Sequence, residues 1–256
     1  MDGTTGGASD GVGFGYNVKN VEKLIVQIGE TIPKIKAAMS DPWPTLSNIM
    51  STEWIGPDEI AAEADFADAM EELFVSCQGI VVESQINLAQ SAEGWKKFTA
   101  GNTIEGGSHQ PDMSGVSSIE YEVTEVQSLD LVVTPTKSFE AEDIKTKSAQ
   151  SQEIINDAID DYTKSVYNGV KGLYEVFDEA VGAGFLGSDQ KTAINNYLKR
   201  VGVVLGKVAV CVKKLKVCVA EAAAGNVSQS GQSAAQFNEQ NPTIADESNV
   251  NYTGGQ

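Results

Sequence analysis

The residues that could carry chemistry in this chain are few, and their spacing does not suit catalysis. The single histidine, His109, directly follows Ser108 and lies three residues before Asp112, so a serine, histidine and carboxylate set can be written down. Adjacent serine and histidine side chains do not point at each other as nucleophile and base must, and no strand and turn presents the serine. The sequence therefore predicts a protein that is not an enzyme.

The three cysteines do not form a recognisable metal site. Zinc sites take ligands at short regular spacings, and a carboxylate-bridged site in a helical bundle needs Glu-x-x-His pairs that one histidine cannot supply. Cys211 and Cys218 are seven residues apart in an expected helix, which separates them by roughly 10 Å and forbids a disulfide. We interpret both, with Cys77, as small core residues and expect no metal and no cofactor.

Charged residues gather at two places. Seven acids between Asp58 and Glu72 lack the glycine and the spacing of a calcium loop, so we interpret them as a solvated helix start favoured by the helix dipole. The set is Asp58, Glu59, Glu63, Asp65, Asp68, Glu71 and Glu72. We interpret the lysines between 207 and 216 as the solvated side of an amphipathic helix, with a basic patch that contacts a partner's acids or a membrane surface as the alternative.

The composition excludes several classes of function. Of 256 residues, 41% are hydrophobic, which is enough for a sizeable core, and 36 acids against 18 bases give a formal charge of −18. That charge disfavours binding to nucleic acid or to anionic lipid. The segment 201–219 contains four lysines, so no membrane span is predicted. The first residues lack the basic region and apolar core of a secretory signal, so we expect export, if it occurs, to use another route.

Four stretches have the apolar spacing of helices. The first starts at residue 18, should kink at Pro33 and is broken by Pro42 and Pro44 before a short helix leads to Glu53. A second helix of about forty residues follows. A third runs from about Phe139. The fourth, with a wide heptad face, is marked by Ile194, Tyr197, Leu198, Val201, Val204, Leu205, Val208, Cys211, Val212, Leu215, Cys218 and Val219.

Residues 100–138 lack the apolar spacing of a helix. Ile119, Tyr121 and Val123 alternate with polar residues, and the later positions 129, 131 and 133 do likewise. Period-two alternation with β-branched residues predicts strands, so we expect a small β-hairpin that turns near Gln127 and Ser128.

Each pair of long helical stretches is joined by an aromatic, an aliphatic and a glycine. The first joint is Trp54-Ile55-Gly56 and the second is Phe185-Leu186-Gly187. Glycine can take a positive φ where a helix ends, and Pro57 or Ser188 suits the start of the next helix. The alternative interpretation is two ordinary turns between helices that end in glycine.

Two helical hairpins with long apolar faces should pack on each other. The sequence thus predicts an all-α fold, an elongated four-helix bundle with a small β-hairpin insertion between its two hairpins. The expected parts are a flexible Gly-rich arm (1–17), a first hairpin (18–99), the insertion (100–138), a second hairpin (139–223) and a disordered polar tail (224–256).

This plan resembles the WXG family of small type VII secretion substrates. Trp54 and Gly56 match the Trp-X-Gly turn of that family, and Phe185 and Gly187 match a relaxed form with phenylalanine for tryptophan. The resemblance spans roughly residues 18–99 and 139–223. Family members pair as dimers of helical hairpins, so the resemblance implies that this chain joins such a dimer in one polypeptide.

The family's export signal is a tyrosine followed four residues later by an acid, just beyond the second helix of the hairpin. Tyr121 and Glu125 have this spacing in the expected strand segment, and Tyr174 and Asp178 have it inside the third helix. The alternative for each pair is a core tyrosine beside a solvated acid. The prolines at 33, 42 and 44 also depart from the family, whose members usually keep that helix whole.

The resemblance implies a non-enzymatic binding protein, either a leaderless type VII secretion substrate or its helical partner. Its expected partners are the type VII machinery or a WXG-like or toxin protein, with a homo-oligomer as a further option. The expected location is outside the cell without a signal peptide, or the cytoplasm before export. Two alternatives remain: a structural subunit of a filament or phage particle, and a helical pore-forming protein.

Overall fold

The fold was taken from a computed structural model, which describes residues 18–54, 57–101, 123–134 and 149–224. These residues form six α-helices, and the fold is all-α as predicted. The expectations for the arm, for Ile119 and Tyr121 in the insertion, for the start of the third helix at Phe139 and for the tail beyond 224 lie outside the described residues, as does His109. The helices are α1 (Val18–Gly29), α2 (Thr31–Ser40), α3 (Trp43–Glu53), α4 (Pro57–Gly101), α5 (Ala149–Gly182) and α6 (Ser188–Ala223).

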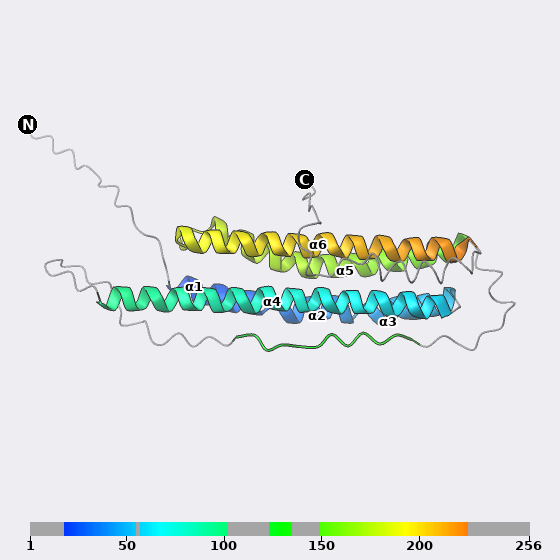
Figure 1. The fold of residues 1–256 in the computed structure, drawn as a ribbon, viewed down its shortest axis with the longest axis horizontal. Helices are drawn as coiled ribbons and strands as arrows, with labels where there is room; N and C mark the ends of the chain where they lie inside the picture. The colour runs from blue at the N-terminus through cyan, green and yellow to red at the C-terminus, as the bar shows by residue number, and fades with distance from the viewer. Residues whose placement is uncertain (1–17, 55–56, 102–122, 135–148, 225–256) are drawn as a thin grey trace, which may run out of the picture.

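The six helices make a bundle of four long rods (Figure 1). The first rod is the series α1, α2 and α3, which packs against α4 on one side and α5 on the other. Helix α6 closes the bundle because it packs against both α4 and α5. With 45 residues, α4 is about 67 Å long.

Prolines divide the first rod as predicted. The ring of Pro33 conflicts with the carbonyl of residue 29, and α1 ends at that residue, Gly29. Helix α2 ends at Ser40, just before Pro42, and Pro44 is accommodated in the first turn of α3, where its missing N–H costs nothing. The three short helices nevertheless continue one apolar face, because Val21, Ile32 and Leu46 are all buried.

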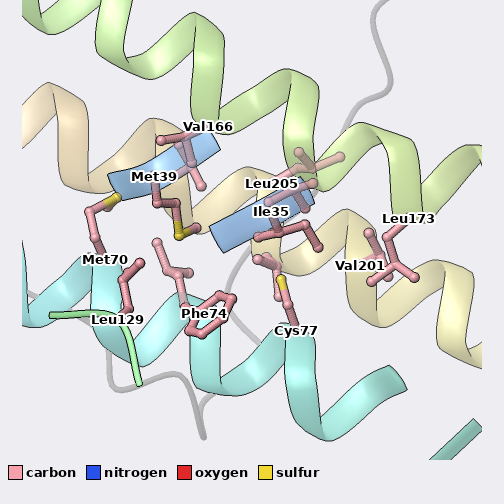
Figure 2. Packing of buried hydrophobic residues seen from close by; sticks show 14 of the residues in the cluster. Ile35, Met39, Met70, Phe74, Cys77, Leu129, Val166, Leu173, Val201 and Leu205 are labelled. Carbon is pink, nitrogen blue, oxygen red and sulfur yellow. The ribbon is translucent and has the colours of Figure 1, made fainter. Parts of the chain in front are cut away.

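All four rods contribute to one core (Figure 2). Its central layers bring together Ile35 and Met39 of α2 and Phe74 of α4 with residues of α5 and α6, among them Leu173 and Val201. The heptad face predicted for α6 is confirmed, since all twelve of its positions except the partly buried Leu198 are buried. Within the described residues, no helix is both long and apolar enough to cross a membrane.

Helices α4 and α5 run in the same direction, so the chain must return along the bundle between them (Figure 1). Residues 123–134, here called the strap, lie along the outside of α4 on that return path. Leu129 and Leu131 are buried in the core cluster, and Val133 packs against it, as their alternation predicted.

The predicted turn of the β-hairpin is wrong. The described part of the insertion contains no strand, and the strap does not reverse at Gln127 and Ser128. Its contacts instead progress in one direction down α4, from Gln85 at Thr124 to Glu63 at Thr134. Period-two alternation signals an extended chain with one buried face, and here helices rather than a neighbouring strand supply the surface that buries it.

Candidate functional site

The first predicted joint is a tight corner organised by Trp54. This residue is buried and extended (φ −125°, ψ 92°), and it ends α3. Its indole Nε1 donates a hydrogen bond of 2.9 Å to Oδ2 of Asp58 in the first turn of α4. The tryptophan therefore ties the end of one helix to the start of the next. Ile55 and Gly56 lie outside the described residues.

The second joint has a different local geometry. Leu186 is buried and Phe185 only packs against the edge of the core. Gly187, rather than the predicted Ser188, is the N-cap residue of α6, and its φ of −70° is open to any amino acid. The expectation of a positive φ at this glycine is wrong, although a Cβ there would lie 2.5 Å from Oε1 of Gln190. The glycine makes room for a side chain rather than for a left-handed backbone.

The described members of the two candidate export signals lie on two different elements, the strap and α5. Glu125 is exposed on the strap, and its partner Tyr121 lies outside the described residues. Tyr174 and Asp178 are one turn apart on α5, where Tyr174 packs against the core and Asp178 is exposed.

The strap is held by side chains that hydrogen-bond to its main chain. The carboxamide of Gln78 makes two such bonds with one residue: its Nε2 donates to the carbonyl of Gln127 at 2.7 Å, and its Oε1 accepts from the N–H of Gln127 at 2.7 Å. Oε1 of Gln85 accepts from the N–H of Thr124 at 3.0 Å, while its Nε2 donates to the carbonyl of Ile25 at 3.0 Å. Both glutamines are buried.

The other end of the strap is held by carboxylates and by α3. Oε1 of Glu71 accepts from the N–H of Leu131, and Oε1 of Glu63 accepts from the N–H of Thr134, each at 3.4 Å. From α3, Nε1 of Trp43 donates to the carbonyl of Val132 at 2.9 Å, and Oγ of Ser47 accepts from the N–H of Thr134 at 3.2 Å. We call the six contributing residues the strap seat: Trp43, Ser47, Glu63, Glu71, Gln78 and Gln85.

The strap and its seat match in length. Gln85 and Glu63 are 22 residues apart on α4 (85 − 63), a rise of about 33 Å. Thr124 and Thr134 are ten residues apart (134 − 124), and an extended chain also covers about 33 Å in ten residues. The extended strap can therefore lie along one face of α4 and contact it over the whole length of the strap.

Two acids of the predicted solvated cluster are buried, which corrects the interpretation of that cluster. Glu59 and Glu63, one turn apart at the start of α4, are both fully buried. Burial, followed by the neighbouring carboxyls of Glu63 and Asp58, raises the pKa of Glu59 to about 9. At neutral pH Glu59 therefore keeps its proton.

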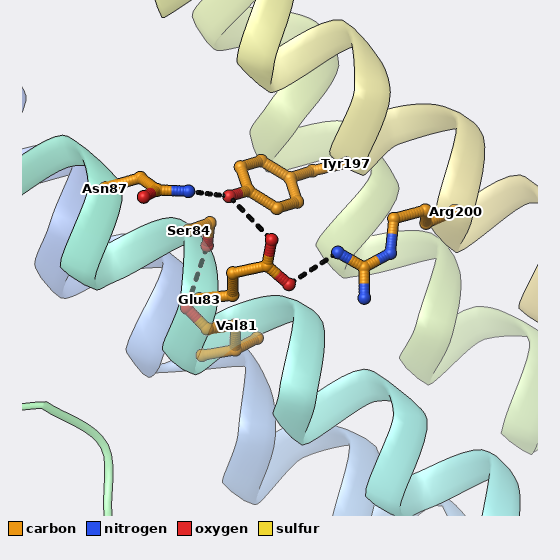
Figure 3. Close-up of polar contacts among 6 residues, drawn as sticks. All are labelled: Val81, Glu83, Ser84, Asn87, Tyr197 and Arg200. Carbon is orange, nitrogen blue, oxygen red and sulfur yellow. Dashed lines mark hydrogen bonds and ion pairs between the residues drawn. The ribbon is translucent and has the colours of Figure 1, made fainter.

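Helices α4 and α6 are also joined by a polar contact between side chains (Figure 3). Glu83 accepts from the hydroxyl of Tyr197 at 3.3 Å and from Nη1 of Arg200 at 2.6 Å, and Asn87 donates to the same tyrosine oxygen. The guanidinium of Arg200 lies 5.7 Å from the ring centre of Tyr197. These contacts add polar links between α4 and α6 to the apolar packing of the core.

The prediction that the cysteines are core residues is confirmed. The prediction that the lysines between 207 and 216 are solvated is wrong for one of them, Lys207. Cys77, Cys211 and Cys218 are free and buried, and burial raises their pKa values to about 12, 11 and 11. Lys207 is also buried, and its charge lowers the pKa of Cys211 in opposition to burial. No group of His, Cys, Asp and Glu that could hold a metal ion occurs among the described residues.

No family model, no curated protein and no solved structure matches this chain.

Sequence reasoning missed the strap seat. Its α4 members recur at intervals of eight, seven and seven residues (63, 71, 78 and 85), which places them on one face of the helix. Polar residues at heptad spacing beside an apolar stripe could have indicated a buried polar ladder. The sequence does not indicate that these polar side chains hydrogen-bond to the main chain of another segment of the same protein.

Proposed function

We propose that this protein is a non-enzymatic helical binding protein of the WXG-like kind, exported by a type VII secretion machine or escorting a partner protein to it. The observation that carries the proposal is the packing of two helical hairpins, α1–α4 and α5–α6, on each other within one chain. Their turns lie at opposite ends of the bundle (Figure 1). The arrangement has the form of a pair of hairpins fused by the return segment.

The role of Trp54 supports the proposal. A buried tryptophan that bonds to the first turn of the next helix fixes the angle between two helices. This is the function that a Trp-X-Gly turn would have in a hairpin. Phe185 has no ring N–H to make the same bond, and its side chain packs against the edge of the core.

The export signal in this proposal is Tyr121 with Glu125, because Glu125 is exposed on the outer side of the strap. Tyr174 is less suited to a receptor since its side chain packs against the core. A receptor that reads the first pair would approach the bundle from the strap side.

The test measures tagged protein in the culture supernatant of a source strain, with and without its type VII ATPase. We expect export to be lost without the ATPase, and Tyr121→Ala or Glu125→Gln to reduce export at least tenfold while the helical circular dichroism stays unchanged. Asp130→Asn is the matched control, because Asp130 is another exposed acid on the strap and should leave export intact. Retention in every strain would contradict the cargo role and favour an intracellular chaperone or an assembly subunit.

A further inference from the structure

The strap seat binds the strap mainly through hydrogen bonds to its main chain rather than through contacts with its side chains. Gln78 pairs with both main-chain groups of Gln127, as a neighbouring strand would, and five further bonds from seat residues reach main-chain atoms. Only Leu129 and Leu131 of the strap are buried, whereas Val126 and Val132 are 81% and 74% exposed. A site built this way accepts many sequences, provided that they are extended and carry two aliphatic side chains two residues apart.

We propose that the strap seat is a binding site for an extended peptide segment of a partner protein, and that the strap is the occupant which this segment displaces. The partner segment would span at least the ten residues needed to reach from Gln85 to Glu63. It would place aliphatic side chains where Leu129 and Leu131 lie, with no side-chain demand at most other positions.

The ends of the site add selectivity. At the Gln85 end, a Cβ on Gly29 would lie 2.7 Å from Nε2 of Gln85 and 2.7 Å from Oγ1 of Thr124, so this glycine keeps space for a small polar side chain. At the other end, Ser47 pairs with the hydroxyl of Thr134 as well as with its N–H. The segment should therefore have serine or threonine near both ends.

Charge indicates how a partner segment could bind better than the strap. The strap carries the acids Glu125 and Asp130, and it lies against a seat that contains the acids Glu63 and Glu71, in a chain of net charge −18. Acids on both sides of the site oppose binding, whereas basic side chains at the two exposed positions 125 and 130 would favour it. We therefore expect the partner segment to be basic where the strap is acidic.

This inference does not depend on export by a type VII machine, because it concerns only the seat and an extended ligand. A protein that stays in the cell could use the same site. Failure of the export test would leave this inference standing, and failure of the binding test would leave the export proposal standing.

The test uses the full chain with residues 123–134 replaced by twelve Gly and Ser residues, and a fluorescent peptide with the sequence of residues 123–134. In fluorescence anisotropy we expect the peptide to bind this variant at least tenfold more tightly than it binds the unaltered protein. The control peptide has Leu-Ser-Leu-Asp in place of Ser128-Leu129-Asp130-Leu131, which keeps the composition but turns the leucines outward, and it should bind at least tenfold more weakly.

Further variants assign the binding to the seat. Gln78→Ala in the replaced background should weaken binding three- to tenfold, whereas Val75→Ala, on an exposed side chain of the same helix, should have no effect. A peptide with lysine at positions 125 and 130 should bind at least threefold more tightly at low salt, and that gain should shrink as salt is added.

Three results would overturn the inference. One is a folded strap-replaced protein that does not bind the peptide, or that binds the control peptide equally well. Another is loss of folding both in this variant and in Leu129→Ser/Leu131→Ser, which would make the strap an integral part of the core. A third is a strap-exchanged dimer of the unaltered protein in sedimentation, which would assign the seat to a second copy of this chain.

Discussion

At the scale of single residues, the least expected feature is the pair of buried carboxyls at the start of α4. Glu59 and Glu63 lie one turn apart on the buried side of the helix, and Glu59 keeps its proton at neutral pH. A helix N-terminus favours negative charge, but the cost of burying two carboxylates side by side is larger. The cost of burying a second carboxylate therefore exceeds the stabilisation that the helix dipole gives to a negative charge, and Glu59 is protonated.

The Glu59 pair predicts a pH dependence of stability. Because the pKa of Glu59 rises from 4.5 in the unfolded chain to about 9 in the folded protein, the folded state binds the proton more tightly. Stability contributed by this group is full below pH 4.5 and falls as the pH rises toward 9, by up to about 1.4 kcal/mol per pH unit. Chemical denaturation between pH 5 and 9 should show this fall.

The matched variant for this measurement is Glu59→Gln, which is neutral at every pH. The difference in unfolding free energy between the variant and the unaltered protein should grow in favour of the variant as the pH rises. Asp68→Asn is the control on an acid of the same helix that is exposed and should leave the slope unchanged. Parallel pH curves for Glu59→Gln and the unaltered protein would contradict a buried, protonated Glu59.

At the scale of the elements, the interrupted first rod is held closely against α5. Gly169 of α5 faces α2, where an added Cβ would lie 2.6 Å from Cβ of Ala38 and 3.4 Å from Cα of Ile35. Gly172, one turn further along α5, has no atom within 4 Å of the same position. Two glycines in one helix thus have different physical roles, and only the first permits close packing of helices.

This contrast predicts opposite effects of the same substitution. Gly169→Ala should destabilise the protein by about 1–3 kcal/mol, because Ala38 and the backbone of α2 must move. Gly172→Ala should stabilise it by about 0.5–1 kcal/mol through helix propensity. Urea denaturation of both variants checks this, and destabilisation by both would show that Gly172 is also a packing position.

At the scale of the whole molecule, the buried thiols report on how cooperatively the bundle opens. Cys77 lies on α4, and Cys211 and Cys218 lie on α6, so the three thiols sample two rods of one core. Each is buried, and burial raises each pKa, so both access and thiolate formation require the bundle to open.

We expect all three thiols to react with a disulfide reagent at one common slow rate in the native protein, and within the mixing time in denaturant. The native rate should rise with denaturant in parallel with global unfolding, since the rods share one core. Reaction of Cys77 alone at an early stage would show instead that α4 separates from the rest of the bundle before global unfolding.

The positions of the helices, their breaks and their buried faces can be predicted from local sequence patterns. Apolar spacing, Pro33 and Pro42 act within one or two turns, so local physics is enough to place α1 to α6 and the α6 core positions. The alternation of Leu129 and Leu131 likewise indicated an extended chain with one buried face.

The surface on which that extended chain packs, and the identity of the buried acids, depend on long-range packing. The strap seat joins residues 39 to 89 positions apart in the sequence, and its geometry exists only once α3 and α4 are side by side. Glu59 and Lys207 are buried for a similar reason, because neighbouring rods cover faces that their own helices would leave in water. Periodicity indicates which face of a helix or strand is apolar. Which polar residues are buried together with that face depends on how the elements pack on one another.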